Sequence, residues 1–292
     1  MSKVPREDVL RHLPIRGREA FTTLGGKFRE RIKRRQLNIL RSFVPVLKHV
    51  LEPDEEILLS ARAISPVTVL EELTTGWLIF FIRRCVLVVT NRRILHFPTT
   101  PGFTPRNSMS QIRFTDIESL KGGRKIKFRY KSGRGETFHR VLNGKKLGRI
   151  LSAHMTGSSA STQYRGRHAV CPKCNSALVE ARYQCPRCRL EFKNPRTARF
   201  LSILFPGGGY FYTRHIFLGL ADAIVEISLI VFLLLFLLGH FSGDPRFQGG
   251  WPVAAILSAV LLLEKLVTIY HANVFVREYI PVEKTFRRIS RG

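Results

Sequence analysis

Two long apolar stretches near the C-terminal end constrain the fold of this chain most. Residues 216–238 read IFLGLADAIVEISLIVFLLLFLL, and residues 251–272 read WPVAAILSAVLLLEKLVTIYHA. Each is long enough to cross a bilayer, which needs about 20 predominantly apolar residues. The uncharged run at 227–238 offers no polar face to water, and this argues against a helix pair in a soluble core. The Gly-rich segment between the stretches favours a transmembrane helical hairpin.

Lysine and arginine are unevenly placed around these predicted spans. The connecting loop contains Arg246 alone, whereas the flanks contain Arg196, Arg199, Arg214, Arg277, Lys284, Arg287, Arg288 and Arg291. Because cytoplasmic segments carry the positive excess, both termini are predicted to be cytoplasmic. The first 20 residues lack the apolar stretch of a signal peptide. We therefore expect a protein of the inner, cytoplasmic membrane.

Four charged residues interrupt the spans: Asp222 and Glu226 in the first, Glu264 and Lys265 in the second. A charge in hydrocarbon costs about 2.5 to 3.5 kcal/mol on insertion scales, so each needs a partner or water. At about 1.5 Å per residue, Glu226 and Lys265 lie about 15 and 12 Å from the cytoplasmic boundary. We therefore predict an ion pair between Glu226 and Lys265, with Asp222 and Glu264 nearer the boundary. A proton or ion relay is the alternative.

The segment CPKCNSALVEARYQCPRC contains two Cys-x-x-Cys pairs, formed by Cys171, Cys174, Cys185 and Cys188. Each pair brings two thiolates to one tight turn, and Zn²⁺ accepts four sulfurs in a tetrahedron. Two disulfides or a redox pair are the alternatives, which a cytosolic location disfavours. The spacing predicts a zinc ribbon at 169–194. Its zinc is structural, because four thiolates leave no coordination position open.

Between residues 52 and 156 the sequence predicts repeated strands and a closing helix that begins near residue 145. The tetrapeptides TNRR and SGRG indicate hairpin turns. The apolar run GWLIFFI at 76–82 is expected to form a buried core strand, since continuous apolar runs of this length are commonly buried. The alternative is an apolar loop that enters the headgroup layer, with Trp77, Phe80 and Phe81 as anchors.

The stretch VLVVTNRRILHF, followed by SMSQIRFTDIESL, a hairpin and a helix, resembles the bacterial pleckstrin-homology and GRAM superfamily. The resemblance implies a seven-stranded bent sheet or barrel, closed by a C-terminal helix and often used to bind lipid or protein. The resemblance does not identify lipid-binding residues in this chain. A weaker resemblance, carried by FLSILFPGGGYFYTRHIFLGL, is to small modules with two transmembrane helices.

The strand RKIKFRYK places Lys125, Lys127, Arg129 and Lys131 on one face and apolar residues on the other. Residues 1–170 hold 33 basic and 13 acidic side chains, out of 48 and 21 in the whole chain. This excess predicts a polyanionic partner. We expect anionic lipid headgroups to meet this strand, together with Arg83 and Arg84. Nucleic acid is the alternative, but base-stacking aromatic residues are missing from the cationic face.

The sequence thus predicts a multidomain α+β membrane protein with six parts: a basic amphipathic helical segment (1–51), the pleckstrin-homology-like domain (52–156), a flexible linker (157–168), the zinc ribbon (169–194), the membrane module (196–275) and a basic cytoplasmic tail (276–292). Three alternatives remain for the basic helical segment: it packs on the sheet, lies on lipid or binds nucleic acid. No familiar catalytic motif is present. We expect a non-enzymatic protein that binds anionic lipid or a partner protein. A membrane-tethered nucleic-acid binder or regulator and an accessory subunit of a transport or assembly complex are the alternatives.

Overall fold

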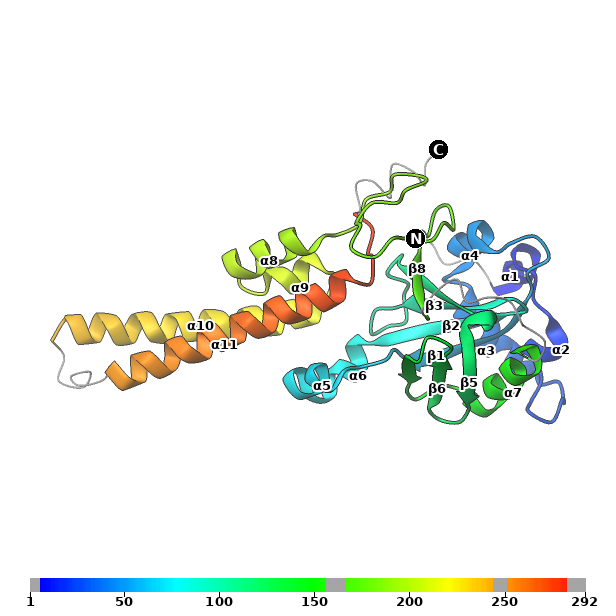
Figure 1. Cartoon of the computed structure of the whole chain (residues 1–292). Coiled ribbons are helices and arrows are strands. Elements are labelled where there is room, and N and C mark those ends of the chain that lie inside the picture. The colour runs from blue at the N-terminus through cyan, green and yellow to red at the C-terminus, as the bar shows by residue number, and fades with distance from the viewer. Residues whose placement is uncertain (1–5, 156–165, 244–250, 283–292) are drawn as a thin grey trace. The chain divides into compact units, whose positions relative to one another are not determined.

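The computed structural model describes residues 6–155, 166–243 and 251–282, which form two compact units (Figure 1). The first unit is Met1–Glu191 with Pro281–Gly292, and the second is Phe192–Ile280. The predicted linker at 157–168, the loop between the apolar helices and the basic tail lie wholly or partly outside the described residues.

A five-stranded antiparallel sheet forms the centre of the first unit, in the order β1-β2-β3-β4-β8. Its strands are β1 (Ile57–Ile64), β2 (Arg84–Thr90), β3 (Arg93–Pro98), β4 (Met109–Arg113) and β8 (His168–Val170). The predicted TNRR turn joins β2 to β3, where the Thr90 hydroxyl accepts hydrogen bonds from the N–H groups of Arg92 and Arg93 at 3.2 and 3.0 Å. Strand β8 was not expected. Its residues, assigned to the linker and the zinc ribbon, pair with β4 instead.

A three-stranded antiparallel sheet follows, formed by β5 (Ile117–Lys121), β6 (Ile126–Tyr130) and β7 (Gly135–Phe138), and then the helix α7 (Gly144–Met155). Apolar residues of both sheets and of α7 form one core, which includes Leu87, Phe128 and Leu147. Residues 57–155, all of them described, do not close into a barrel. The two sheets remain separate apart from an isolated bridge between Ile64 and His139.

Helices near the N-terminus cover the other face of the five-stranded sheet. They are α1 (Arg6–His12), α2 (Gly17–Ala20), α3 (Glu30–Leu40) and α4 (Val44–Val50), and they share a second core with the sheet. Pro45 lies in the first turn of α4, where its missing N–H group costs no helical hydrogen bond. Of the three alternatives for the basic helical segment, packing on the sheet is the one that the structure shows. Its arginines remain at the surface.

The segment between β1 and β2 is helical, and the prediction of a core strand at 76–82 is wrong. It forms α5 (Val69–Thr75), the 3₁₀ helix η1 (Gly76–Leu78) and α6 (Ile79–Ile82). A capping box between Thr68 and Glu71 starts α5, and such local hydrogen bonds favour a helix. Within α6 only Ile79 and Ile82 are buried. The apolar run therefore lies mostly at the surface.

The second unit is helical and contains α8 (Pro195–Leu204), α9 (Gly208–Tyr212), α10 (Ile216–Phe241) and α11 (Trp251–Val276). Both α10 and α11 are 26 residues long and apolar enough to cross a membrane. Only 6% and 11% of their most apolar stretches are buried, unlike the core helices of a soluble protein. Gly207, the residue before α9, has a φ of 67° and lies in the bend between α8 and α9.

Candidate metal centre and charged sites

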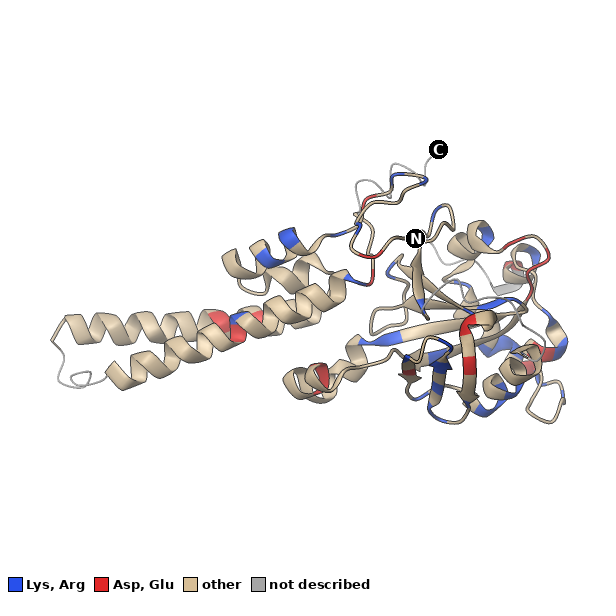
Figure 2. Ribbon diagram, viewed as in Figure 1, with Lys and Arg blue, Asp and Glu red and all other residues tan. Residues whose placement is uncertain are grey.

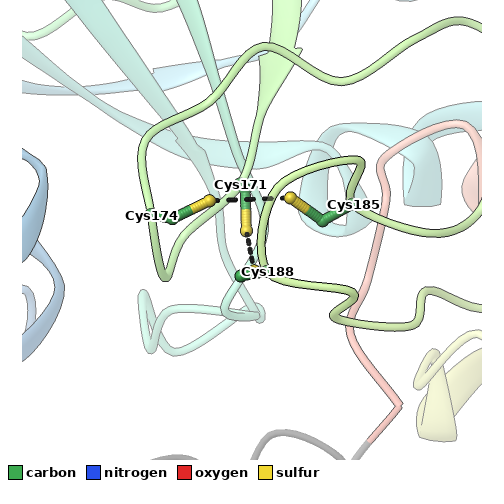
Figure 3. Close-up of side chains that lie close together, drawn as sticks. All are labelled: Cys171, Cys174, Cys185 and Cys188. Carbon is green, nitrogen blue, oxygen red and sulfur yellow. Dashed lines mark hydrogen bonds between the residues drawn. The ribbon is translucent and has the colours of Figure 1, made fainter.

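The four cysteines predicted to bind zinc lie together in the first unit (Figure 3). Their sulfur atoms lie within 4.8 Å of one another, and the Cys171–Cys188 and Cys174–Cys185 pairs are each 3.5 Å apart. A tetrahedral zinc ion with Zn–S bonds of about 2.3 Å places its sulfurs about 3.8 Å apart. No disulfide links these four described residues. Their geometry suits one four-coordinate metal ion.

Each Cys-x-x-Cys pair stands on a turn of the same kind. The carbonyl oxygen of Cys171 accepts a hydrogen bond from the N–H group of Asn175 at 3.0 Å, and that of Cys185 accepts one from Arg189 at 3.1 Å. Asn175 and Arg189 have similar positive φ values, 56° and 57°. Asparagine adopts this left-handed conformation more readily than arginine. The repeated turn directs both thiol pairs toward the same point.

Backbone hydrogen bonds favour the thiolate form of Cys185. Burial raises the pKa of this thiol, but the N–H group of Cys188 and the Ser176 hydroxyl lower it, so that its pKa falls to about 6. Burial raises the pKa of Cys171. Metal ligands must be deprotonated, so a bound cation would be needed to hold Cys171 as a thiolate.

A buried polar network around Arg93 ties the cysteine turns to the sheet. The guanidinium donates hydrogen bonds to Glu55 at 2.8 and 2.9 Å, to Gln111, and to Asn175 beside the first cysteine pair at 3.2 Å. Burial raises the pKa of Glu55, but the charge of Arg93 and hydrogen bonds from Arg93, the Glu52 N–H group and Thr90 together keep it below its ordinary value. This network was not predicted from the sequence. The available signal was an arginine at the start of the mostly apolar strand RILHF.

The predicted basic face of β6 is exposed. Lys125, Lys127, Arg129 and Lys131 are exposed, while the residues between them are buried. Arg129 forms an ion pair with Glu118 of β5, at 3.4 Å, in which both side chains are exposed. Such exposed pairs contribute little, commonly about 0 to 1 kcal/mol. The face therefore keeps a net positive charge.

The two arginines at the start of β2 differ, and the expectation that both meet lipid is corrected for Arg83. Arg83 is only 8% exposed and forms an ion pair with the buried Glu71 of α5. Breaking that pair would leave an uncompensated buried charge, so Arg83 is not available to a headgroup. Arg84 is half-buried, donates to the carbonyl oxygen of Pro101, and lies over the Phe81 ring.

The charged residues of α10 and α11 gather at one level of the helix pair (Figure 2). Glu226 forms the ion pair with Lys265 that the sequence led us to expect. Lys265 also donates to the carbonyl oxygen of Ser202 in α8, at 2.8 Å. This second contact of Lys265 was not predicted, because α8 precedes the predicted spans and the sequence gives no sign that it packs against them.

The two remaining carboxylates share one hydroxyl. Thr268 Oγ1 lies 3.1 Å from both carboxylate oxygens of Asp222 and 3.0 Å from Glu264 Oε1. Asp222, Glu226 and Glu264 each place an oxygen within 4.8 Å of the others. The structure thus joins the four predicted residues into one cluster, with Asp222 and Glu264 beside the ion pair. Thr268 was not anticipated, since a threonine in an apolar helix is ordinary.

Comparison with known proteins gives no relative for this chain: no protein-family model matches it, nor does any curated protein or solved structure. The pleckstrin-homology and GRAM resemblance therefore remains a prediction, and the site is interpreted from its own geometry.

Proposed function

We propose that this protein is a non-enzymatic membrane protein whose first unit binds anionic lipid at the cytoplasmic face of the inner membrane. Two helices with the length and composition of membrane spans support the anchoring. The excess of basic residues supports an anionic partner. One observation carries the proposal: a group of large apolar side chains exposed between β1 and β2.

Six large apolar side chains of α5, η1 and α6 are exposed, and we call them the apolar tip: Val69, Leu70, Leu73, Trp77, Leu78 and Phe81. Val69, Leu73 and Trp77 are 84%, 80% and 68% exposed. Single exposed apolar side chains are normal, but a local group of them marks an interaction surface. Trp77 packs edge-on against Phe81, and tryptophan favours the headgroup level of a bilayer.

Basic side chains border the apolar tip. The guanidinium of Arg84 lies 4.6 Å from the centroid of the Phe81 ring. The guanidinium of Arg140, which follows β7, lies 5.4 Å from the centroid of the Phe80 ring in α6. Each Lys or Arg near an anionic membrane contributes about 1 kcal/mol of attraction.

The order of the elements supports the same function. Seven strands, β1 to β7, lie within residues 57–138, all of them described, and α7 follows. This is the order that the resemblance to pleckstrin-homology and GRAM domains implies. The four cysteines would hold a structural zinc ion, because four sulfur ligands leave no position for a substrate. A protein partner at the apolar tip is the nearest alternative to lipid.

The test uses Trp77 as a reporter in the full-length protein. The chain contains two tryptophans, so a Trp251→Phe variant leaves Trp77 alone. We expect brominated lipids to quench Trp77 when this variant is reconstituted into vesicles of phosphatidylcholine mixed with phosphatidylglycerol. Quenching should weaken in pure phosphatidylcholine and at high salt, because charge attraction brings the unit to the surface.

A matched pair of variants tests whether quenching depends on the apolar tip or on any exposed leucine. Leu73→Asp should remove most of the quenching, whereas Leu24→Asp, an exposed position in the turn before α3, should not. Absence of Trp77 quenching in both kinds of vesicle would contradict the proposal. Salt-sensitive retention of DNA or RNA by the same preparation would then favour the nucleic-acid alternative.

A further inference from the structure

Five arginines line one hollow on the first unit, and we call it the arginine pocket: Arg31, Arg34, Arg35, Arg62 and Arg140. Its volume is about 640 Å³, within the range of about 300 to 1,000 Å³ typical of small-molecule sites. Phe103 forms part of the wall, and none of the described residues that line the pocket is Asp or Glu. A smaller hollow of about 190 Å³ shares Arg62 and Phe103 and adds Arg41.

The positions of these arginines follow from the way α3 is fixed to the sheet. Arg31, Arg34 and Arg35 are three and four residues apart, so they share one face of α3. The neighbouring Gln36 is fully buried and bonds the edge strand β1: its amide donates to the Ser60 carbonyl at 2.9 Å and accepts from the Ser60 N–H group at 2.7 Å.

Arg62 lies two residues after Ser60 and is the single exposed residue of β1. Since side chains of a strand alternate, Ser60 and Arg62 face α3 together. The Gln36–Ser60 bonds thus fix the helical arginines opposite Arg62. The pocket is a consequence of this packing, whereas an isolated basic helix would spread the same side chains into water.

The arginine pocket also has a built aromatic wall. The guanidinium of Arg62 lies 4.4 Å from the centroid of the Phe103 ring, and that of Arg84 lies 5.1 Å from it. Phe103 has a φ of 60°, which is unfavourable for a bulky residue. Its turn is held by hydrogen bonds between Thr100 and both Phe103 and Thr104. Strained residues of this kind cluster at ligand sites.

The positive charge of the pocket is not neutralised within the described residues. Arg34 has an exposed partner, Glu30, at 3.5 Å. For Arg31, Arg35, Arg62 and Arg140 no ion pair forms with a described carboxylate. Burial and then the charges of Arg35 and Arg84 lower the pKa of Arg62. Like charges held together repel, and a bound anion relieves that repulsion.

We propose that the arginine pocket binds an anion that carries two or more phosphate groups, either free in solution or as a lipid headgroup. The planar guanidinium matches phosphate oxygens in pairs, and several of them converge here. A group with two phosphates uses arginines from both α3 and β1, which a single phosphate does not require. This inference goes beyond the lipid-surface proposal, because a free anion needs no membrane insertion by the apolar tip.

The experiment titrates sodium pyrophosphate into the full-length protein in a neutral detergent, by calorimetry at constant ionic strength, with sodium sulfate as the reference anion. We expect saturable binding of pyrophosphate and much weaker binding of sulfate. Replacing Arg35 and Arg62 together by Gln should weaken pyrophosphate binding about tenfold or more, since each loses charge-assisted hydrogen bonds.

The control variant replaces Lys127 and Arg129 by Gln, which removes the same charge from the basic face of β6. It should change pyrophosphate binding less than about twofold, because exposed charges outside the pocket act mainly through screened attraction. A second variant, Arg35→Lys with Arg62→Lys, keeps the positive charge but loses the planar guanidinium groups. It should bind pyrophosphate with an affinity between those of the parent protein and the Gln variant. Equal effects of the two Gln variants, or no binding by the parent protein, would overturn the proposal.

Two further measurements identify the source of the phosphates and keep the two proposals apart. Cardiolipin carries two phosphates per lipid. If the ligand is a lipid headgroup, cardiolipin vesicles should compete with pyrophosphate better than phosphatidylglycerol vesicles of equal charge. Equal competition by the two kinds of vesicle assigns the site to a free anion. Leu73→Asp, which should prevent quenching of Trp77, should leave pyrophosphate binding unchanged. Loss of both Trp77 quenching and pyrophosphate binding in this variant would contradict a pocket that acts independently of the apolar tip.

Discussion

At the scale of single residues, neighbours in the sequence have opposite environments. Arg83 is buried against Glu71, whereas Arg84 lies on the aromatic rings of Phe81 and Phe103. Arg92 pairs with Glu52 at the surface, whereas Arg93 is buried in the network that reaches the cysteine turns. The formal charge of an arginine therefore does not show whether an anion can reach it.

The metal centre gives a prediction at this scale. Purified full-length protein should contain about one zinc ion per chain, and Cys185→Ser should remove most of it, because a tetrahedral site with three thiolates binds far more weakly. Elemental analysis by mass spectrometry measures the ratio. The control is Cys85→Ala, in the core strand β2 outside the cluster, which should retain its zinc. Reduced parent protein without zinc would contradict the assignment.

At the scale of elements, α7 is fixed by a close approach of two backbones. A Cβ atom on Gly144, the first residue of α7, would overlap the carbonyl oxygen of Gly123 between β5 and β6. Gly148, one turn later, lies against Gly122. The closing helix therefore depends on glycine where it meets the smaller sheet, although glycine is unfavourable inside helices.

Gly144→Ala should destabilise the first unit. Alanine favours the helix by about 1 kcal/mol, but the overlap forces a backbone shift that commonly costs about 1 to 3 kcal/mol. Hydrogen exchange of the full-length protein should become faster in α7 and β5 and stay unchanged in the second unit. Lys145→Ala, at the exposed neighbouring position, changes helix propensity little and creates no overlap, so it should not accelerate exchange. Equal exchange in both variants would argue against the close contact.

At the scale of the whole molecule, the second unit depends on compensation of charge between its helices. Lys265 is the cation within a cluster of three carboxylates, and it bonds both Glu226 and the Ser202 carbonyl. An unpaired charge in hydrocarbon costs about 2.5 to 3.5 kcal/mol on insertion scales. If these helices span the membrane, the pairing acts as a clasp between them.

Lys265→Glu should therefore lower the amount of protein that accumulates in the membrane, because four carboxylates then face one another without a cation. Adding Glu226→Lys should restore much of it by reversing the pair. Quantitative immunoblots of membrane fractions measure both. If the double variant accumulates no better than the single one, a relay or a contact between chains explains the cluster better than a clasp.

The sequence by itself determined the features that depend on local pattern. Length and apolarity marked α10 and α11, the Cys-x-x-Cys spacing selected the four clustered cysteines, and alternation along β6 separated exposed cations from buried Ile126, Phe128 and Tyr130. Each depends on residues within one element, or on a spacing that brings ligands together directly. The predicted pairing of Glu226 with Lys265 likewise followed from depth in two antiparallel helices.

Only the tertiary structure decided which surfaces these elements make. It showed that residues 76–82 are helical, that β8 extends the larger sheet, and that Arg83 is buried. It also gathered arginines from α3, β1 and the segment before α7 around one pocket. Contacts between residues far apart in the chain determine these outcomes, and an apolar run or a basic residue has the same local pattern whether it is covered or exposed.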